Sequence, residues 1–207
     1  MNLDKEQELW RDGFRVVTGI DEAGRGAWAG PVAAAAVAFP PGFDPADCGI
    51  ERVADSKKLS PAVREELYCR ILRSAFAFGI GFASAREIDD MGIVPATRLA
   101  MLRAIRRMKR SPDFLLLDYM VLPSVSTPFI SIPRADSTFF SVAAASIVAK
   151  VARDRLMIRL DRRHPGYAFS ANKGYGTSAH REALASLGAC PAHRYRFEPV
   201  RRVNGLF

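Results

Sequence analysis

The sequence of 207 residues predicts a mixed α/β fold, and three features of its hydrophobic pattern indicate this fold class. Two short apolar runs, Phe14 to Ile20 and Val32 to Phe39, follow each other closely and predict neighbouring strands. A third run, Asp113 to Asp118, is apolar between two acids, which is typical of a buried central strand. Helical spacing dominates the segments around these runs. A sheet that begins with two adjacent strands is mixed, because a pure βαβ winding would place a helix between them.

The first half of the chain is expected to contain three strands and two helices. Ser60 and Pro61 predict the start of the first helix, because serine is a favoured N-cap and proline is favoured at the first helical position. Ser84 and Glu87 have the spacing of a capping box, which predicts a second, short helix. The expected order is a strand at 14–20, a glycine-rich loop at 24–31, a strand at 32–39, a loop at 40–60, a helix from 61 to about 74, a strand at 75–83 and a short helix that ends near Gly92.

The second half is expected to be mostly helical. Residues 94–109 have helical spacing with a basic outer face, and they precede the strand at 113–118. A long helix is expected from Phe139 to about Arg163, apolar on one side and rich in arginine on the other. A last helix is expected at about 178–187, with Gly188 as a left-handed C-cap. We interpret residues 1–207 as a single domain whose basic C-terminal helical part lies at about 165–207.

The composition is that of an ordinary globular protein, with 49% hydrophobic and 25% charged residues, and it excludes disordered, collagen-like and coiled-coil chains. The longest apolar runs, 32–39 and 142–149, are shorter than the roughly 18 residues that a membrane-spanning helix needs. The charged N-terminal stretch has no hydrophobic segment, so we expect no secretory signal and no membrane association. The three cysteines are scattered, which favours reduced thiols and a cytoplasmic location.

The charge of the chain indicates a polyanionic partner. The sequence has 30 Lys and Arg residues against 22 Asp and Glu residues, for a net charge of +8. Residues 1–133 contain equal numbers of basic and acidic residues, so the whole excess lies in residues 134–207. Such a one-sided basic segment favours binding to nucleic acid, because each cation that neutralises a phosphate releases counterions. Solubility alone is the other explanation for this charge.

Four acids at the ends of predicted elements are candidate metal ligands. Asp21 and Glu22 end the first strand, Asp118 ends a later strand, and Asp136 precedes the long helix. A carboxylate at the end of a buried strand is costly unless a cation compensates it. Several carboxylates together can hold a hard divalent cation, which is used where a phosphate is attacked. Each acid alone is explained as well by an N-cap or a surface ion pair, and Asp136 could cap a helix that begins near Thr138.

Gly24, Arg25 and Gly26 follow the first two acids directly. Two glycines let a backbone approach a ligand closely, and they expose N–H donors. A dinucleotide-binding loop does not fit, because the spacing runs to Gly30 instead of following the GxGxxG pattern. The two preceding carboxylates would also repel a pyrophosphate. A simple glycine turn remains the alternative for this tripeptide.

Ser146, Lys150 and Arg153 fall on one face of the predicted long helix. We interpret them as a row that faces phosphates, with a pairing of Lys150 and Asp154 as the alternative. The three histidines, at positions 164, 180 and 193, lack metal-ligand spacing, and we expect ordinary surface or loop residues there. The sequence shows no arrangement typical of a Ser-His-Asp or Cys-His nucleophile.

Four blocks of sequence stand out: GIDEAGRGAWAGPVAAAAV (19–37), ADSKKLS (54–60), ADSTFFSVAAASIVAKVARD (135–154) and NKGYGTSAHREAL (172–184). They resemble, in this order, the signature blocks of the ribonuclease HII family. The resemblance extends from about Arg15 to about Arg196. The first and third blocks are long and specific, so a chance match to all four is very improbable.

The resemblance implies a ribonuclease H-like mixed β-sheet flanked by helices, with a C-terminal helical extension. It implies a metal-dependent endonuclease that hydrolyses the RNA strand of RNA–DNA hybrids. It also implies cleavage on the 5′ side of single ribonucleotides embedded in duplex DNA, which leaves 3′-hydroxyl and 5′-phosphate ends. The family's metal-binding carboxylates correspond to Asp21, Glu22, Asp118 and Asp136. Its substrate-sensing Gly-Arg-Gly element corresponds to Gly24, Arg25 and Gly26, and its junction-sensing tyrosine corresponds to Tyr175.

Two positions depart from the family pattern. A glycine usually follows the third acid, where this chain has Tyr119. Lys-Gly often precedes the fourth acid, where this chain has Arg134 and Ala135. The acids themselves are intact. Further candidates for substrate binding are Lys57, Ser146 and Lys150.

The chemistry of a phosphodiester explains the need for several carboxylates. Its negative charge repels a nucleophile, and two Mg²⁺ or Mn²⁺ ions would both activate water and stabilise the leaving oxygen. Discrimination of RNA from DNA requires contact with the 2′-hydroxyl, which the backbone of residues 24–26 is expected to supply. The ring of Tyr175 is expected to fit against the next deoxyribose. We expect a monomer that binds RNA–DNA hybrids and ribonucleotide-containing DNA duplexes, and a sliding-clamp contact through Gly205 to Phe207 is a further hypothesis.

Two other functions explain part of the pattern. A non-catalytic nucleic-acid-binding module accounts for the charge, but not for clustered acids that would repel the same backbone. A glycoside hydrolase accounts for paired carboxylates, but it requires neither a metal nor a basic surface. Binding without cleavage in Mg²⁺ or Mn²⁺ would favour the module, and activity that survives EDTA would favour the glycosidase.

Overall fold

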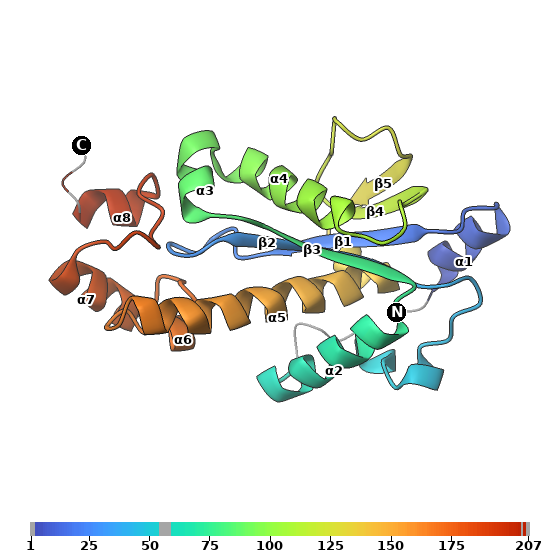
Figure 1. Ribbon diagram of the computed structural model, residues 1–207, viewed down its shortest axis with the longest axis horizontal. Helices are drawn as coiled ribbons and strands as arrows, with labels where there is room; N and C mark the ends of the chain where they lie inside the picture. Colours follow the sequence, from blue (N-terminus) through green and yellow to red (C-terminus); the bar gives the residue numbers. More distant parts are fainter. Residues whose placement is uncertain (1–2, 54–58, 204, 206–207) are drawn as a thin grey trace.

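The structure, a computed structural model, describes residues 3–53, 59–203 and 205, and its helices lie on both sides of a β-sheet (Figure 1). The strands of these residues are β1 (Val17–Ala23), β2 (Val32–Ala38), β3 (Ala77–Ala83), β4 (Phe114–Asp118) and β5 (Phe129–Ile132). The α-helices are α1 (Asp4–Arg11), α2 (Pro61–Ser74), α3 (Ala85–Met91), α4 (Ile93–Arg106), α5 (Phe140–Arg163), α6 (Phe169–Asn172), α7 (Ser178–Leu187) and α8 (Glu198–Val203). Short 3-10 turns include η1 (Ala46–Cys48) and η3 (Ala135–Ser137).

The sheet is mixed, with the strand order β3-β2-β1-β4-β5. β1 pairs with β2 and β2 pairs with β3 in antiparallel fashion. β1 also pairs in parallel with β4, which pairs in parallel with β5. The prediction of a mixed sheet that begins with two adjacent strands is confirmed. The central parallel pair places the C-terminal ends of β1 and β4 side by side.

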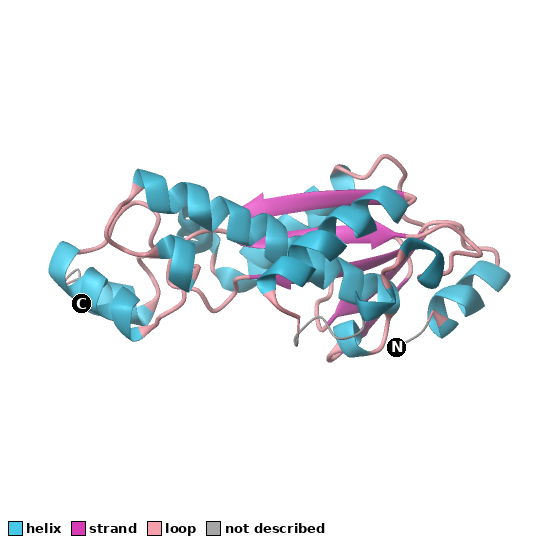
Figure 2. Ribbon diagram, turned by 90° about the horizontal axis from the view of Figure 1, so that it is seen from below, coloured by secondary structure: helices cyan, strands magenta, loops and turns pink. Residues whose placement is uncertain are grey.

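Helices cover both faces of the sheet (Figures 1 and 2). α5 packs against β1 and β2 on one face, and α4 packs against β2 and β3 on the other. Glycines permit both close approaches. A Cβ atom on Gly19 of β1 would lie 2.2 Å from the Ser141 carbonyl carbon of α5, and one on Gly81 of β3 would lie 2.0 Å from the Ala100 oxygen of α4. The alanine-rich β2 is wholly buried between these two layers.

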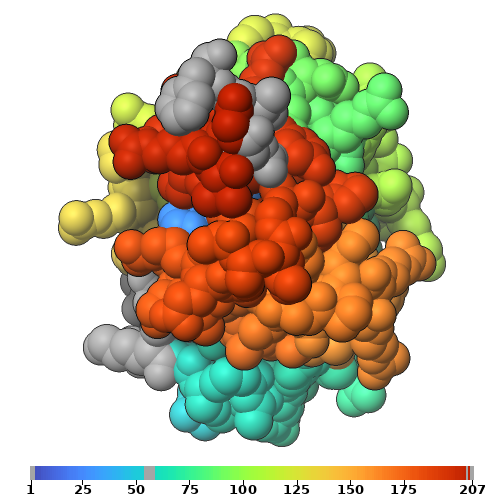
Figure 3. Space-filling view, turned by 90° about the vertical axis from the view of Figure 1, so that its left-hand side faces the viewer, coloured from blue at the N-terminus to red at the C-terminus, as the bar shows by residue number. Residues whose placement is uncertain are grey.

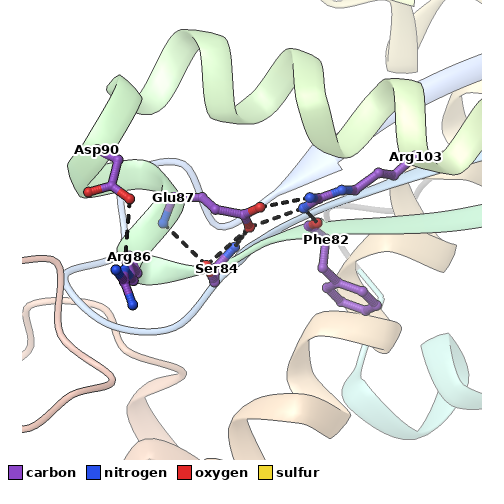
Figure 4. Close-up of polar contacts among 6 residues, drawn as sticks. All are labelled: Phe82, Ser84, Arg86, Glu87, Asp90 and Arg103. Carbon is purple, nitrogen blue, oxygen red and sulfur yellow. Dashed lines mark hydrogen bonds and ion pairs between the residues drawn. The ribbon is translucent and has the colours of Figure 1, made fainter.

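Capping residues begin the helices at the predicted positions. The Val63 N–H donates to Ser60 Oγ, and Pro61 is the first residue of α2. Ser84 and Glu87 form the predicted capping box of α3 (Figure 4). Gly188 ends α7, but its φ of 72° is combined with a ψ of −171°, so the prediction of a left-handed cap is wrong. The Gly188 carbonyl accepts a hydrogen bond from the Tyr167 hydroxyl instead of lying in a helical turn.

Several described elements were absent from the sequence prediction, namely α1, β5, α6, α8 and the turn η1 within the expected loop at 40–60. Because α8 follows α7, the expectation that the helix at 178–187 is the last one is wrong. Residues 54–58, which include the predicted substrate-binding Lys57, lie outside the described residues. None of the described helices combines the length and apolar composition that crossing a membrane requires.

The C-terminal helices gather at one end of the molecule, where residues from the end of α5 onwards form most of the visible surface (Figure 3). Their connecting segments hold the loop that follows β1. The Trp28 N–H donates to the Gly174 carbonyl at 2.7 Å, and the Arg194 N–H donates to the Trp28 carbonyl at 2.8 Å. Ala29 and His193 form a β-bridge. The C-terminal extension therefore supports the loop at 24–31, next to the ends of β1 and β4.

Candidate active site

Two strands and one turn position the four predicted acids. In the parallel pairing of β1 with β4, Ile20 lies opposite Leu117, so the next residues, Asp21 and Asp118, are neighbours at the ends of the two strands. The Ala135 N–H donates to Asp118 Oδ1 at 3.0 Å. This bond holds the turn η3, which contains Asp136, beside the end of β4. The fold thus brings Asp21, Glu22, Asp118 and Asp136 to one edge of the sheet.

Of the two acids on β1, Asp21 is buried and Glu22 is mostly buried, and the pKa of each is raised. Burial raises the pKa of Asp21 well above its usual value, and the charge of Glu22 raises it further. The Glu22 N–H donates to Asp21 Oδ1 at 2.8 Å, and a hydrogen bond from Ser146 also lowers this pKa, but burial outweighs both. Burial raises the pKa of Glu22 as well, although the Arg25 guanidinium, 3.2 Å from Glu22 Oε1, opposes that shift. Asp118 raises both pKa values by repulsion.

The donor set fits a hard divalent cation. Glu22 Oε2 is buried and has no hydrogen-bond partner among the described residues, so it is an anionic oxygen that a cation would satisfy. Across residues 3–53, 59–203 and 205, no group of three or more Asp, Glu, His or Cys side chains is arranged so that it could hold a metal ion. Mg²⁺ in proteins is usually held by one or two carboxylates together with water and substrate phosphate oxygens. Adjacent carboxylates such as Asp21 and Glu22 are sufficient for binding of that kind.

A cavity of about 340 Å³ opens beside the acids. It brings together five of the predicted site residues, and these are Glu22, Gly24, Ser146, Lys150 and Tyr175. Arg64 of α2 also lines it, and sequence reasoning missed this residue. The signature block at 54–60 lies directly before α2. A signature block at that position could have indicated that the start of α2 approaches the site.

Lys150 pairs with Asp154 and also lies on the cavity wall, where it could face a phosphate. Its Nζ is 2.8 Å from Asp154 Oδ1, so the pairing one helical turn away is present. The same ammonium group lies 5.8 Å from the centre of the Tyr175 ring and lines the cavity. Lys150 is therefore a cation on the cavity wall whose charge is partly balanced by Asp154.

The predicted row of three residues on α5 is broken at Arg153. Its side chain is fully buried, and it donates to the backbone carbonyls of Pro31 at 2.9 Å and Ala29 at 3.2 Å. The expectation that Arg153 faces a phosphate is therefore wrong. Helical spacing places Ser146, Lys150 and Arg153 on one side of α5, but the loop at 24–31 covers the Arg153 end of that side.

Tyr175 faces the cavity from the segment between α6 and α7. Its side chain is 37% exposed, and its backbone N–H donates to the Asn172 carbonyl at 3.0 Å. The guanidinium of Arg153 lies 5.3 Å from the centre of its ring. Two cations, Lys150 and Arg153, therefore lie near a ring that is still partly exposed.

Asp136 does not cap the long helix. α5 begins at Phe140, its N-cap is Phe139, and that residue makes no side-chain capping bond. Asp136 is 5% exposed, and the Ser137 hydroxyl donates to its Oδ1 at 3.4 Å. The alternative of a cap on α5 is therefore excluded, and η3 places Asp136 near the end of β4.

Two of the three histidines are buried. The expectation of a surface or loop residue is wrong for His180, which lies within α7, whereas His193 lies in the segment between α7 and α8 but is buried there. His180 and His193 are 0% and 1% exposed, and their Nε2 atoms lie 3.0 Å apart. Burial, together with the neighbouring charge of His180, lowers the pKa of His193 to about 4. Both rings pack against Phe169. They connect α7 to the segment before α8 and thereby stabilise the C-terminal extension.

Comparisons with known proteins agree on one family. The model of the family described as Ribonuclease HII matches residues 18–200. A protein named Ribonuclease HII from Dehalococcoides mccartyi is 49% identical over 203 residues, which cover 98% of this chain and 95% of that protein. The predicted family resemblance is thereby confirmed.

Solved structures share the fold. The ribonuclease H2 from Pyrococcus horikoshii OT3 has a TM-score of 0.77 at 24% identity, over 91% of this chain and 97% of that chain, which is evidence for the fold alone. A chain in the structure of the PCNA:RNase HII complex from Archaeoglobus fulgidus has a TM-score of 0.73 at 28% identity, over 88% of this chain and 95% of that chain. The predicted ribonuclease H-like fold is confirmed.

Proposed function

Because the chain belongs to the ribonuclease HII family of metal-dependent endoribonucleases, we propose that Asp21, Glu22, Asp118 and Asp136 are the carboxylates that hold its divalent metal ions. One observation carries this proposal. Asp21 is buried and Glu22 is mostly buried beside Asp118 at the ends of paired strands, where loss of solvent and repulsion raise the pKa values of Asp21 and Glu22. A divalent cation is the partner that compensates both burial and repulsion.

The reaction is hydrolysis of the RNA strand of an RNA–DNA hybrid, as in other ribonucleases H. When bound, two Mg²⁺ or Mn²⁺ ions supply an activated water and stabilise the charge on the leaving oxygen. Ser146 orients Asp21 through its hydrogen bond to that carboxylate. Arg64 and Lys150, on the wall of the same cavity as Glu22, hold backbone phosphates of the duplex. Departure of the 3′ oxygen leaves a 3′-hydroxyl and a 5′-phosphate.

Recognition of a single ribonucleotide rests on two elements beside the acids. The exposed Gly26 leaves open space where a side chain would stand, so the backbone of residues 24–26 reaches the 2′-hydroxyl. Tyr175 stacks against the following sugar, which fits when that sugar is deoxyribose. The cut then falls on the 5′ side of an embedded ribonucleotide. A non-catalytic binding module is not favoured, because it gives no role to buried, repelling acids.

The rest of the chain supports binding without reading sequence. We propose that residues 1–207 act as one monomeric catalytic domain, in which the basic part at about 165–207 follows the phosphates of the duplex. The complex of PCNA with the Archaeoglobus fulgidus enzyme supports a clamp contact in this protein too. Deletion of Gly205 to Phe207 should abolish such a contact in gel filtration with a bacterial sliding clamp. Unchanged co-elution would exclude this terminus as the contact, and light scattering in the same run tests the monomer.

The proposal is tested by isosteric replacement of the two acids on β1. Asp21→Asn and Glu22→Gln each remove one anionic ligand and keep the side-chain volume. We expect cleavage of an RNA–DNA hybrid in Mg²⁺ or Mn²⁺ to fall by about a hundredfold or more, the scale seen when a transition-state contact is lost. Asp47→Asn, at an exposed acid in η1, is the matched control and should cleave at the wild-type rate.

Thermal unfolding of the same variants separates loss of metal binding from misfolding. In EDTA, Asp21→Asn should be more stable than the wild type by about 1 kcal/mol, because it removes a buried, repelled charge. Addition of Mn²⁺ should stabilise the wild type and not the variant. Wild-type turnover in both acid variants, or equal stabilisation of all proteins by Mn²⁺, would refute the metal assignment.

A further inference from the structure

A fully buried guanidinium lies inside the loop that follows β1. Arg194 donates from Nη2 to the Gly24 carbonyl at 2.7 Å, from Nη1 to the Arg25 carbonyl at 2.7 Å and from Nε to the Gly30 carbonyl at 3.0 Å. Buried charges are normally paired with an opposite charge, whereas this one is satisfied by three backbone oxygens of a single loop. Burial, and secondarily the charge of Arg153, lowers the pKa of Arg194 to about 9, so the group stays protonated at neutral pH.

These three bonds determine where the N–H groups of the loop point. In a trans peptide the C=O and N–H groups are directed to opposite sides. Since the carbonyls of Gly24 and Arg25 turn inward to Arg194, the N–H groups of Arg25 and Gly26 turn away from it. Gly26 is exposed, and a Cβ atom there would have no neighbour within 4 Å. A carbonyl that accepts a charge-assisted bond also polarises its peptide unit and strengthens the N–H on the other side.

A second buried guanidinium connects this loop to Tyr175. Arg153 bonds the far end of the loop and lies 5.3 Å from the centre of the Tyr175 ring. A Cβ atom on Gly24, whose φ is 91°, would lie 1.9 Å from Arg153 Nε, so no other residue fits between loop and guanidinium. The Trp28 N–H donates to the carbonyl of Gly174, directly before Tyr175. The loop and the tyrosine are therefore held in one relative position.

We propose that Arg194 is the positioning residue for recognition of ribose: its planar fork orients the N–H groups of Arg25 and Gly26 toward the 2′-hydroxyl of the substrate. Arg153 keeps that loop in register with Tyr175. The inference rests on the proposed function, in which residues 24–26 sense the ribonucleotide. It adds a residue that lies in none of the four signature blocks and touches no substrate itself.

The variant Arg194→Lys tests this role, because lysine keeps the charge but offers a single ammonium group in place of a planar fork. For a DNA duplex with one embedded ribonucleotide, we expect kcat to fall by about tenfold or more, because the N–H groups of the loop would be misplaced relative to the 2′-hydroxyl. KM should change little. Affinity for an all-DNA duplex and the Mn²⁺ dependence should stay at wild-type values. Arg86→Lys, at a highly exposed arginine outside the basic part at 165–207, is the matched control and should match the wild type.

Two spectroscopic measurements give readouts that activity does not. In Arg194→Lys, the amide resonance of Gly26 should shift, because the Arg25 carbonyl loses its hydrogen bond from Arg194. The amide resonances of Gly79 and Gly81 in β3 should not shift. In the wild type, which needs no variant to fold, the Arg194 Nε proton should exchange with water far more slowly than that of the exposed Arg196. Equal exchange rates, or an unmoved Gly26 resonance, would overturn the inference.

The outcomes also separate this inference from the proposed function. If the wild type cleaves the single-ribonucleotide duplex and Arg194→Lys cleaves it equally well, the positioning role is wrong and the proposed function stands. If the wild type does not distinguish that duplex from an all-DNA duplex, the proposed function fails. Slow exchange of the Arg194 Nε proton would then show only that the loop is ordered.

Discussion

Tyr119 has a backbone conformation that suits glycine. It follows Asp118 and has a φ of 54°, while its side chain is 70% exposed. The family pattern places a glycine at this position, and the conformation gives the physical reason, because a Cβ atom is unfavourable in the left-handed region. The chain therefore tolerates local strain directly beside a proposed metal ligand. Arg134, with a φ of 58°, carries similar strain before Asp136.

Tyr119→Gly should stabilise the protein. Relief of left-handed strain is worth about 1–2 kcal/mol, and the added freedom of glycine in the unfolded chain offsets roughly half of it. We expect the free energy of unfolding in urea to rise by about 0.5–1 kcal/mol, with cleavage unchanged. Val121→Gly, at another exposed position of the same segment but without a positive φ, is the control and should destabilise. Destabilisation by Tyr119→Gly would contradict this explanation of the family glycine.

At the same scale, helical spacing showed which residues share a side of α5 but not what covers that side. The positions of Asp21, Glu22 and Asp118 at the ends of strands were predictable, because each of these acids ends an apolar run. Arg153 was not, because its burial depends on the loop at 24–31 folding back over the helix. Spacing in the sequence contains no information about that distant contact.

At the scale of elements, Glu87 joins α3 to α4 and to the edge strand β3 (Figure 4). Its carboxylate accepts bonds from the Arg103 guanidinium at 2.7 and 3.0 Å, and Arg103 also donates to the Phe82 carbonyl at 2.8 Å. Hydrogen bonds, first from Arg103 and then from the Ser84 backbone, lower the pKa of Glu87 from 4.5 to about 2. The ionised form is therefore favoured by folding.

Because the pKa of Glu87 is lowered in the folded state, its contribution to stability is complete above about pH 4.5 and is lost as the pH falls toward 2. Glu87→Gln should lower the free energy of unfolding at pH 7 by about 1 kcal/mol, a modest value because solvent screens the partly exposed pair. The difference from the wild type should shrink below pH 4.5 in urea titrations. Asp90 forms a highly exposed ion pair with Arg86, so the control variant Asp90→Asn should leave the free energy of unfolding unchanged. A loss of stability in Glu87→Gln that does not depend on pH would refute the ionic role of Glu87.

Elements with local signals were predictable, and those that depend on distant contacts were not. The Ser60-Pro61 start of α2 and the capping box of α3 involve neighbouring residues only. α1 is short and polar, and its Glu6 is buried because it accepts bonds from the Ser141 N–H at 2.9 Å and Ser141 Oγ at 2.7 Å. Glu6 thereby caps the start of α5 from 135 positions away in the sequence. No pattern within α1 itself indicates this contact.

At the scale of the whole molecule, the basic excess lies in residues 134–207, a segment that frames part of the cavity. α5 supplies Lys150, and the segments after it hold Tyr175 and the loop at 24–31. The cavity wall carries the carboxylate of Glu22 together with two cations, Arg64 and Lys150, which suits the metal ion and the phosphate of the proposed reaction. Among the described residues of this basic segment, Lys150 is the cation that lines the cavity, and Arg64 of α2 adds a second one.

Neutralising the cavity cations should change the salt dependence of duplex binding. For Arg64→Gln or Lys150→Gln, we expect the slope of log affinity against log salt to fall by about one unit per lost phosphate contact. Arg86→Gln is the matched control, since Arg86 is highly exposed and lines a different cavity. Fluorescence anisotropy with an all-DNA duplex in EDTA measures the slope without cleavage. An unchanged slope for Lys150→Gln would mean that Asp154 fully balances this cation.

The most direct test of the whole account is the position of the cut in a DNA duplex that contains one ribonucleotide. The acid cluster predicts cleavage with Mg²⁺ or Mn²⁺ and none with EDTA. The loop at 24–26 and Tyr175 predict a single cut on the 5′ side of the ribonucleotide, with a 3′-hydroxyl and a 5′-phosphate at the nick. Sequencing gels of end-labelled strands resolve this position to one nucleotide. Cleavage of long hybrids only, cuts elsewhere in the duplex, or activity that survives EDTA would contradict the account.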